Sequence, residues 1–359
     1  MAGDVRAMVQ TGPGVLEPRT FARPTLGDDD ALLRVEACGI CGTDAETFSG
    51  RVPLVYPVIP GHEPVGLIEA IGDRAAARWQ VGVGDRVVVQ ADFGCGRCLG
   101  CLDHLRCLVA SGNHGFVPVD RSPALWGGYA ELMYLAPGSV PHRVAPRVPP
   151  RTAALYNALG AGFAWAVAAP GLRYGQSVAV MGPGQRGLAC VIAARQAGAA
   201  AVFVTGLGSR DPHKLALAAD LGADLAVDVE VDDPVERVLA ATGGVGVDVV
   251  VDTTPHAVQP VLDAVRMARP GGTVVLAGLK GPGGIPGFPT DDVALRTLTV
   301  RGVRAVDHHS FRLAVDLIES GRVPLGLLHT HHFPLAAAAD AVRTLTDPAA
   351  GAIAVTIEP

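Results

Sequence analysis

The hydrophobic pattern of the chain changes character near residue 151. From residue 31 to about 145, short apolar runs such as "ALLRVEACGI" and "GDRVVVQ" are cut by glycine, proline and aspartate. Short runs bounded by turn residues predict strands, so we expect an irregular all-β region over this part. The alanine-rich stretch "RTAALYNALGAGFAWAVAA" that follows has helical periodicity and indicates a domain boundary.

Beyond this boundary, strand-like and helix-like segments alternate. The strand-like segments are 177–182, 200–206, 225–229, 247–253, 272–278 and 298–303. Helix-sized stretches such as "GLACVIAARQAG" separate several of them, which predicts a doubly wound α/β fold, a parallel sheet with helices on both faces. From about residue 304 the chain carries more helix and ends in a strand-like "AIAVTIEP".

Length and composition narrow the class of protein. A chain of 359 residues exceeds what one hydrophobic core usually holds, and 49% apolar residues with a mean hydropathy of +0.33 indicate a compact two-domain protein. A formal charge of −6 without a dense Lys/Arg run argues against nucleic acid as a partner. The sequence shows no secretion signal and no membrane-length apolar window, so we expect a cytoplasmic protein with no membrane partner.

A glycine-rich loop follows the first strand of the alternating region. "VAVMGPGQRGLAC" places Gly182, Gly184 and Gly187 in a G-x-G-x-x-G spacing between a strand and a helix. Glycines there allow a tight turn and close backbone approach, while the helix N-terminus offers unpaired N–H groups to a pyrophosphate. The loop predicts dinucleotide binding, with a chance glycine-rich turn as the alternative.

The tip of the next strand bears on which dinucleotide is bound. NAD-preferring sites often have an acidic residue there, but this chain has Gly206. Ser209 and Arg210 can bind a 2′-phosphate and favour NADP, unless Arg210 is only a solvated loop charge, whereas Asp211 can reach a ribose and favour NAD. We expect NAD(P) with a lean to NADP. The expected cofactor-binding residues are Gly182, Gly184, Gln185, Arg186, Gly187, Gly206, Ser209 and Arg210.

Four of the seven cysteines lie close together in the chain. Cys95, Cys98, Cys101 and Cys107 form C-x2-C-x2-C-x5-C. Four thiolates can enclose one tetrahedral metal completely, which is typical of structural zinc and leaves no position for a substrate. Disulfides and an iron–sulfur cluster are the alternatives, and the expected cytoplasmic location disfavours disulfides.

A second, mixed set of candidate ligands lies upstream. "ACGICGTDAETF" and "PVIPGHEPVG" offer Cys41, His62 and Glu63. Three such ligands leave the fourth position of zinc open for water or an alcohol oxygen, and chemistry can occur there. Taken singly, these residues also fit a core thiol, a buried histidine and a surface carboxylate.

Together these segments resemble the zinc-dependent medium-chain alcohol dehydrogenases, in the branch that includes sorbitol and threonine dehydrogenases. The resemblance covers nearly the whole chain, because the following segments occur in family order: "CGICGTD", "GHEPVG", "VGDRV", the four-cysteine lobe, "GGYAEL", the glycine loop and "RPGGTVVLAG". It implies a GroES-like catalytic domain over 1–155, completed by 300–359, and a Rossmann cofactor domain over 156–299.

The resemblance also implies residue roles. Cys41 and His62 would bind a catalytic zinc, with Glu63 as third ligand or alternating with water, which makes two Zn²⁺ per chain. Thr43 would hydrogen-bond the substrate oxygen and begin a proton relay, and Asp44 would orient a ligand. Zinc would favour the alkoxide, from which hydride passes to the nicotinamide.

Three positions depart from the family pattern. Where relatives carry a further Cys or Glu near the domain junction, this chain has Ala161, with Asn157 as the nearby polar residue, so more weight falls on Glu63. Where some relatives have a relay histidine, this chain has Glu46, and Glu46 or water is expected to carry the proton onward. The last spacing of the cysteine lobe is two residues shorter than the commonest form, which predicts a tighter lobe.

The expected function is a zinc-dependent oxidoreductase that transfers a hydride between a secondary alcohol, polyol or amino alcohol and NAD(P), giving the ketone. A metal-poor medium-chain reductase or quinone oxidoreductase and a non-catalytic NADP- or zinc-binding sensor are the alternatives. The expected partner is a small-molecule alcohol, and the resemblance implies a homodimer or homotetramer.

Two further cysteines and five histidines are expected to have no role in chemistry. We expect Cys190 to pack in the core, and Cys38 to do so unless it forms a redox pair with Cys41. The histidines at 308, 309, 329, 331 and 332 are expected to be surface or interface residues.

Overall fold

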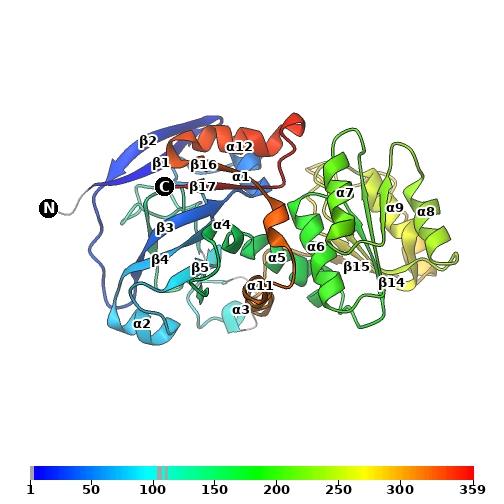
Figure 1. The fold of residues 1–359 in the computed structure, drawn as a ribbon, viewed down its shortest axis with the longest axis horizontal. Coiled ribbons are helices and arrows are strands. Elements are labelled where there is room, and N and C mark those ends of the chain that lie inside the picture. Colours follow the sequence, from blue (N-terminus) through cyan, green and yellow to red (C-terminus); the bar gives the residue numbers. More distant parts are fainter. Residues whose placement is uncertain (1–3, 103–106, 110–111) are drawn as a thin grey trace. The chain divides into compact units, whose positions relative to one another are not determined.

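The computed structural model describes residues 4–102, 107–109 and 112–359. Its chain forms two compact units, one of Met1–Asn157 with Val315–Pro359 and one of Ala158–Ala314. The second unit extends beyond the boundary expected at residue 299, because β15 (Thr299–Gly302) pairs with β14 (Ala268–Leu276) in its parallel sheet. Figure 1 colours the elements by their order along the chain.

The first unit is built around a mixed sheet whose path runs β16-β17-β3-β4-β5-β9, with β8 paired to β3. Its strands are β3 (Ala31–Gly39), β4 (Glu63–Ile71), β5 (Arg86–Val89), β8 (Leu132–Leu135), β9 (Pro141–Arg143), β16 (His329–Pro334) and β17 (Ala354–Glu358). All pairs are antiparallel except β16 with β17. The C-terminal strands therefore complete a sheet begun by the N-terminal part of the chain.

Smaller elements surround this sheet. The remaining strands pair as hairpin-like ribbons, β1 (Val5–Gly12) with β2 (Val15–Phe21) and β6 (Asp92–Phe93) with β7 (Gly112–Asn113). The α-helices are α1 (Gly42–Phe48), α2 (Asp73–Trp79), α3 (Leu99–Leu102), α4 (Pro150–Ala153) and α12 (Ala338–Thr346). Short 3-10 turns are η2 (Leu325–Leu328), η3 (Leu335–Ala337) and η4 (Pro348–Ala350). Two helices continue from one unit into the other, α5 (Tyr156–Gly162) and α11 (His308–Ser320).

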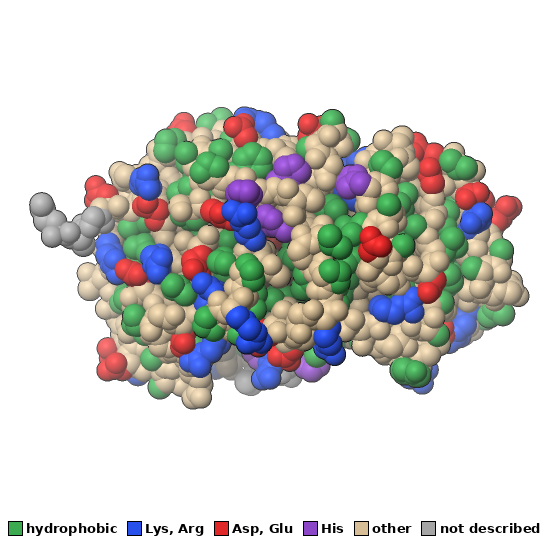
Figure 2. Space-filling view, in the orientation of Figure 1, with side chains coloured by type: hydrophobic (Ala, Val, Ile, Leu, Met, Phe, Trp, Pro, Cys, Tyr) green, Lys and Arg blue, Asp and Glu red, His purple; other side chains and the backbone are tan. Residues whose placement is uncertain are grey.

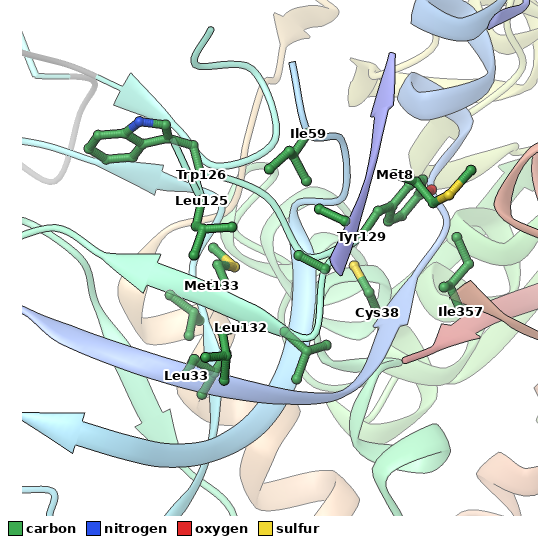
Figure 3. Packing of buried hydrophobic residues seen from close by; sticks show 14 of the residues in the cluster. Met8, Leu33, Cys38, Ile59, Leu125, Trp126, Tyr129, Leu132, Met133 and Ile357 are labelled. Atoms are coloured by element: carbon green, nitrogen blue, oxygen red, sulfur yellow. The ribbon is translucent and has the colours of Figure 1, made fainter. Parts of the chain in front are cut away.

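The core of the first unit packs closely around the strands that lead into the candidate site. Figure 3 shows Cys38, at the end of β3, beside Tyr129, with Met8 and Ile357 on neighbouring strands. A Cβ added to Gly61 would lie 2.5 Å from the Tyr129 ring and 2.9 Å from Cys38 Sγ, so no larger residue fits there. Burying each large apolar side chain contributes about 1.5–3 kcal/mol, and this core therefore holds the site's backbone in place.

The second unit contains a parallel sheet in the order β12-β11-β10-β13-β14-β15. Its strands are β10 (Ser177–Met181), β11 (Ala201–Gly206), β12 (Leu225–Asp228), β13 (Val247–Asp252), β14 and β15, so each expected strand is present. β14 begins four residues earlier than expected because Ala268 pairs with Val247. Counted along the chain, this is the 3-2-1-4-5-6 order of doubly wound dinucleotide-binding folds, which confirms the predicted fold class.

Helices cover this sheet in two groups (Figure 1). α6 (Gln185–Gln196) and α7 (Pro212–Asp220) contact one another and the strands β10, β11 and β12, while α8 (Pro234–Ala241) contacts α9 (Gln259–Met267), which packs on β13 and β14. The unit also contains α10 (Thr290–Leu295) and the π-helix η1 (Phe163–Ala168). In such sheets ligands bind at the carboxyl ends of the strands where the strand order reverses, here between β10 and β13.

Charged side chains of both signs are interspersed on the face shown in Figure 2. Surface ion pairs such as Arg74 with Asp29, whose Nη2 and Oδ2 lie 2.6 Å apart, contribute little to stability because solvent screens them. Within residues 4–102, 107–109 and 112–359, no helix is both long enough and apolar enough to cross a membrane.

Candidate active site and nucleotide-binding loop

Cys41 is held at the N-terminus of α1 by a reciprocal cap. Its thiol accepts the backbone N–H of Thr43 at 3.5 Å, and its own N–H donates to Asp44 Oδ2 at 2.8 Å. Such a cap satisfies donors that a helix start leaves unpaired. Cys41 and Asp44 are both buried. The loop between β3 and α1 therefore presents the Cys41 sulfur in a fixed place, with a carboxylate beside it.

His62 faces the same carboxylate. Its Nδ1 lies 3.3 Å from Asp44 Oδ1, and both side chains are buried. Burial lowers the pKa of His62, but Asp44 and Cys41 together raise it by more, so its pKa lies well above the ordinary value. An imidazole whose Nδ1 faces a carboxylate offers Nε2 to a metal. The negative surroundings that favour the ring's proton also favour a bound cation.

Glu63, the first residue of β4, brings a fully buried carboxylate to the cluster. The amide Nδ2 of Asn157, in α5, donates to its Oε1. The ligand atoms of Cys41, His62 and Glu63 all lie within 4.8 Å of one another. A thiolate and a carboxylate balance the two charges of Zn²⁺, and an imidazole completes an N/O/S set that zinc binds. These residues therefore fit a zinc ion with one position open.

The two residues predicted to move protons lie beside Cys41 along α1. Thr43 is exposed, and its hydroxyl lies 3.6 Å from Cys41 Sγ. Glu46 accepts hydrogen bonds from Arg51 Nε at 2.8 Å and Nη2 at 2.9 Å. The structure thus places Thr43 next to the ligand set, whereas the carboxylate of Glu46 points to an arginine. Ala161 is fully buried and brings no ligand atom.

The four cysteines of the lobe converge as the spacing predicts. Cys98 Sγ lies 3.6 Å from Cys101 Sγ and 3.8 Å from Cys107 Sγ, and none of the seven cysteines forms a disulfide. Sulfurs placed about 2.3 Å from one tetrahedral zinc are about 3.8 Å apart. The N–H groups of Cys95 and Leu108 donate to Cys107 and Cys98, each at 3.3 Å. The geometry fits a single zinc. Residues 103–106, which lie between Cys101 and Cys107, are outside the described residues.

The three glycines of the loop after β10 differ in their surroundings. Gly182 has φ +95°, and a Cβ on Gly187 would lie 1.9 Å from the Gly182 carbonyl oxygen, so both positions require glycine. Gly184, the residue before α6, has open space where a Cβ would stand. This is the arrangement in which a pyrophosphate approaches the backbone at the second glycine and the helix N-terminus. Gln185 opens α6, and the Arg186 guanidinium lies 5.1 Å from the Trp165 ring centre.

The tip of β11 shows why an acidic residue is missing there and what lies near instead. A Cβ on Gly206 would lie 2.7 Å from the Pro183 ring, so a longer side chain does not fit without displacing it. Ser209 donates through its N–H and its hydroxyl to Glu230, at 2.7 and 2.8 Å. Asp211 pairs with Lys214 at 2.7 Å, and Arg210 is exposed. Sequence reasoning overlooked Glu230, whose only signal was its place just after the next strand.

The other cysteines and histidines lie outside both ligand sets. Cys190 is buried in α6, and burial raises the pKa of its thiol to about 12. Cys38 packs in the core of the first unit. His329 Nε2 lies 2.9 Å from Thr356 Oγ1. Among the residues that the structure describes, the histidines of β16 form no group of three ligands, and Cys41 and the lobe belong to the two groups that do.

Two family models match the chain, one over each region described above. Residues 27–144 match the alcohol dehydrogenase GroES-like domain and residues 187–320 match the zinc-binding dehydrogenase family. A protein of Mycobacterium tuberculosis strain H37Rv called "Probable alcohol dehydrogenase adh" is 49% identical over 346 residues, covering 95% of this chain and 94% of its own length. The erythritol/L-threitol dehydrogenase of Mycolicibacterium smegmatis is 30% identical and covers 92% of this chain and 91% of its own.

Solved structures agree in fold over the whole chain. A structure from Sinorhizobium meliloti 1021, described as a zinc-binding dehydrogenase bound to NADP, is 28% identical with a TM-score of 0.86 and covers 99% of this chain and 100% of that chain. Alcohol dehydrogenase TADH from Thermus sp. ATN1 is 29% identical with a TM-score of 0.86, covering 98% and 99%. These matches confirm the resemblance seen in the sequence motifs. The chain therefore belongs to the family of zinc-binding, medium-chain alcohol dehydrogenases and is an oxidoreductase of that family.

Proposed function

We propose that the chain transfers a hydride between a secondary alcohol, polyol or amino alcohol and NAD(P), using a zinc ion held by Cys41, His62 and Glu63. The observation that carries this proposal is the convergence of three buried, chemically different ligands on one point. Burying two potential anions beside a histidine is costly unless a cation compensates their charge. Packing alone therefore does not account for this cluster.

Different residues of the chain have different roles in the proposed reaction. A zinc ion bound here supplies Lewis acidity that favours the deprotonated form of a substrate alcohol. Cys41 and Glu63 balance the charge of the site, and Asp44 fixes the His62 ring through Nδ1. The exposed Thr43 hydroxyl is placed to accept a hydrogen bond from the substrate hydroxyl at Oγ1 and to donate its own hydrogen to water, so that as the substrate's proton moves to Oγ1 the threonine's own proton leaves. A nicotinamide cofactor bound at the glycine loop would supply the hydride acceptor.

Replacing one ligand tests the proposal directly. Loss of Lewis-acid stabilisation worth several kcal/mol corresponds to roughly a 10³-fold fall in kcat/KM at about 1.4 kcal/mol per tenfold. We therefore expect Cys41→Ser to lose this activity against an alcohol and polyol panel and to keep one zinc per chain, where the unchanged enzyme holds two.

Cys190→Ala is the matched control, because it removes a buried thiol outside both ligand sets. It should retain both zinc ions and the activity. One zinc per chain in the unchanged enzyme would instead point to a lobe-only, metal-poor reductase. Turnover that survives complete metal removal would refute the proposal.

The finer choice of cofactor is also a proposal. Ser209 and Arg210, together with the NADP bound to the Sinorhizobium meliloti relative, support a preference for NADP. Glu230 opposes it, since it already occupies both donors of Ser209. Comparing kcat/KM for the two cofactors decides the question, and a preference for NAD of more than about tenfold, or 1.4 kcal/mol, would overturn the lean to NADP.

The proposed compartment is the cytoplasm, where cysteines remain reduced and can bind zinc. By resemblance to the family, the proposed assembly is a homodimer or homotetramer. Light scattering on the purified holoenzyme measures its mass, and a monomer would contradict this part of the proposal.

A further inference from the structure

Asn157 lies against the Glu63 carboxylate although 94 residues separate them in the chain. Both side chains are buried, Asn157 at 5% exposure and Glu63 at 0%. The amide nitrogen Nδ2 donates to Glu63 Oε1. An ionised carboxylate can only accept, so the amide must turn its nitrogen towards Glu63, and its orientation is determined by chemistry.

The backbone of β3 also confines the Glu63 carboxylate, at its other oxygen. Gly39 pairs with Glu63 across β3 and β4, and a Cβ on Gly39 would lie 2.7 Å from Glu63 Oε2. The carboxylate therefore packs over a position that only glycine leaves open. Beside Asn157, the Tyr156 hydroxyl donates to the Val89 carbonyl oxygen at 2.5 Å, which ties the start of α5 to β5. Both groups that confine Glu63 are themselves anchored.

A neutral donor at residue 157 suits the charge of the ligand set. The thiolate of Cys41 and the carboxylate of Glu63 already balance a divalent zinc ion, and a further buried anion would have to be compensated. The amide can donate to one carboxylate oxygen while the other binds the ion. Ala161, one helical turn further along α5, contributes no polar atom.

We propose that Asn157 is a positioning residue for the catalytic metal, and that its amide fixes the plane of the Glu63 carboxylate so that Glu63 serves as the third ligand. This inference rests on the proposed function, since it assumes that zinc binds at Cys41, His62 and Glu63. It assigns to Asn157 the task of making Glu63 a permanent ligand in a chain that has alanine at 161.

The test measures zinc affinity in the holoenzyme by competition with a chromophoric chelator. Loss of a residue that orients a ligand typically weakens metal binding about 10- to 100-fold, and we expect this for the catalytic zinc in Asn157→Ala and in Asn157→Leu, which keeps the branched shape of the side chain without its polar atoms. The lobe zinc should stay bound in both. Asn157→Gln retains an amide donor and should recover part of the affinity.

Cobalt substitution provides a second readout that a merely structural role would not change. The visible spectrum of Co²⁺ at the site should shift in Asn157→Leu if Glu63 no longer ligates. Ser310→Ala is the control, because it removes the hydrogen bond that the buried Ser310 side chain donates to Asp307 in the other unit, and it should alter neither spectrum nor affinity.

The possible outcomes distinguish a failure of the role of Asn157 from a failure of the proposed function on which it rests. Unchanged zinc affinity and cobalt spectrum in Asn157→Ala and Asn157→Leu would overturn the role of Asn157, as would equal losses in Asn157→Gln and Asn157→Leu. If Cys41→Ser holds as much zinc as the unchanged enzyme, the proposed function itself fails, whatever the Asn157 variants show.

Discussion

Glu230 is a residue whose place near the nucleotide-binding region follows only from the fold. It lies 21 residues after Ser209, yet it accepts both the N–H and the hydroxyl of that residue. Parallel strands end on the same edge of a sheet, so the residues that follow β11 and β12 meet there. A carboxylate at this point would repel a 2′-phosphate bound beside it and compete with it for Ser209.

We expect Glu230→Gln to raise the ratio of kcat/KM with NADP to kcat/KM with NAD. One unit charge at about 4 Å in water is worth about 1 kcal/mol, which is roughly a fivefold change in the ratio. Steady-state kinetics with each cofactor and one alcohol measure it.

Glu236→Gln is the matched control, because it makes the same change of charge at an exposed position on α8. The ratio should be unaffected there. An equal rise in both variants would show that net charge, and not the contact with Ser209, is responsible.

At the scale of elements, the turn from β10 into α6 combines two kinds of glycine. A methyl group on Gly187 would meet the Gly182 carbonyl oxygen at 1.9 Å, whereas a methyl group on Gly184 would meet no atom of the protein within 4 Å. Gly184 also has an ordinary φ of −65°. Gly187 is therefore needed for the turn to fold, whereas Gly184 leaves space for a ligand to approach the turn.

This contrast predicts opposite effects of the same substitution. Gly187→Ala should destabilise the second unit by about 1–3 kcal/mol through overpacking. Gly184→Ala should change stability by less than about 0.5 kcal/mol and weaken NAD(P) binding by about tenfold or more, since 1.4 kcal/mol of steric cost is tenfold. Thermal unfolding and calorimetric titration with the cofactor measure the two effects. Unchanged cofactor affinity in Gly184→Ala would rule out pyrophosphate binding at this turn.

The alanine-rich stretch shows where pattern alone was too coarse. It was expected to be helical, and the structure divides it into α4, α5 and the π-helix η1. Leu172 donates to the Val167 carbonyl at 2.9 Å and Ala169 to Ala164 at 2.8 Å, which are the five-residue steps of a π-turn. Alanine favours helix without specifying where its hydrogen-bond step changes.

For the whole molecule, the cysteine lobe is expected to act on stability and not on chemistry. Its four thiols leave no open position on a metal, and their group is separate from that of Cys41. Cys101→Ser should therefore lose one zinc per chain and lower the Tm of the first unit by several degrees, at roughly 2–4 °C for each kcal/mol lost. Calorimetry and zinc analysis measure both, and kcat at low temperature should stay close to that of the unchanged enzyme.

The second unit contains none of the lobe's cysteines, so its unfolding transition should not move in Cys101→Ser. Cys190→Ala is the converse control: Cys190 lies in the second unit, so its replacement should not move the unfolding transition of the first unit. A large loss of kcat in Cys101→Ser, with the catalytic zinc still bound, would contradict a purely structural role.

The sequence alone determined the fold class and the reaction class of this protein. Glycine spacing, cysteine spacing and apolar periodicity express local backbone and burial preferences, and they sufficed to predict the parallel sheet, the glycine loop and the cysteine lobe. The candidate ligands Cys41, His62 and Glu63 followed from the residue types of two short segments and from the family resemblance. Only the tertiary structure decided which distant groups meet, as Asn157 meets Glu63 and Glu230 meets Ser209. Such contacts depend on how strands and helices pack, and neither partner carries a local signal of the other.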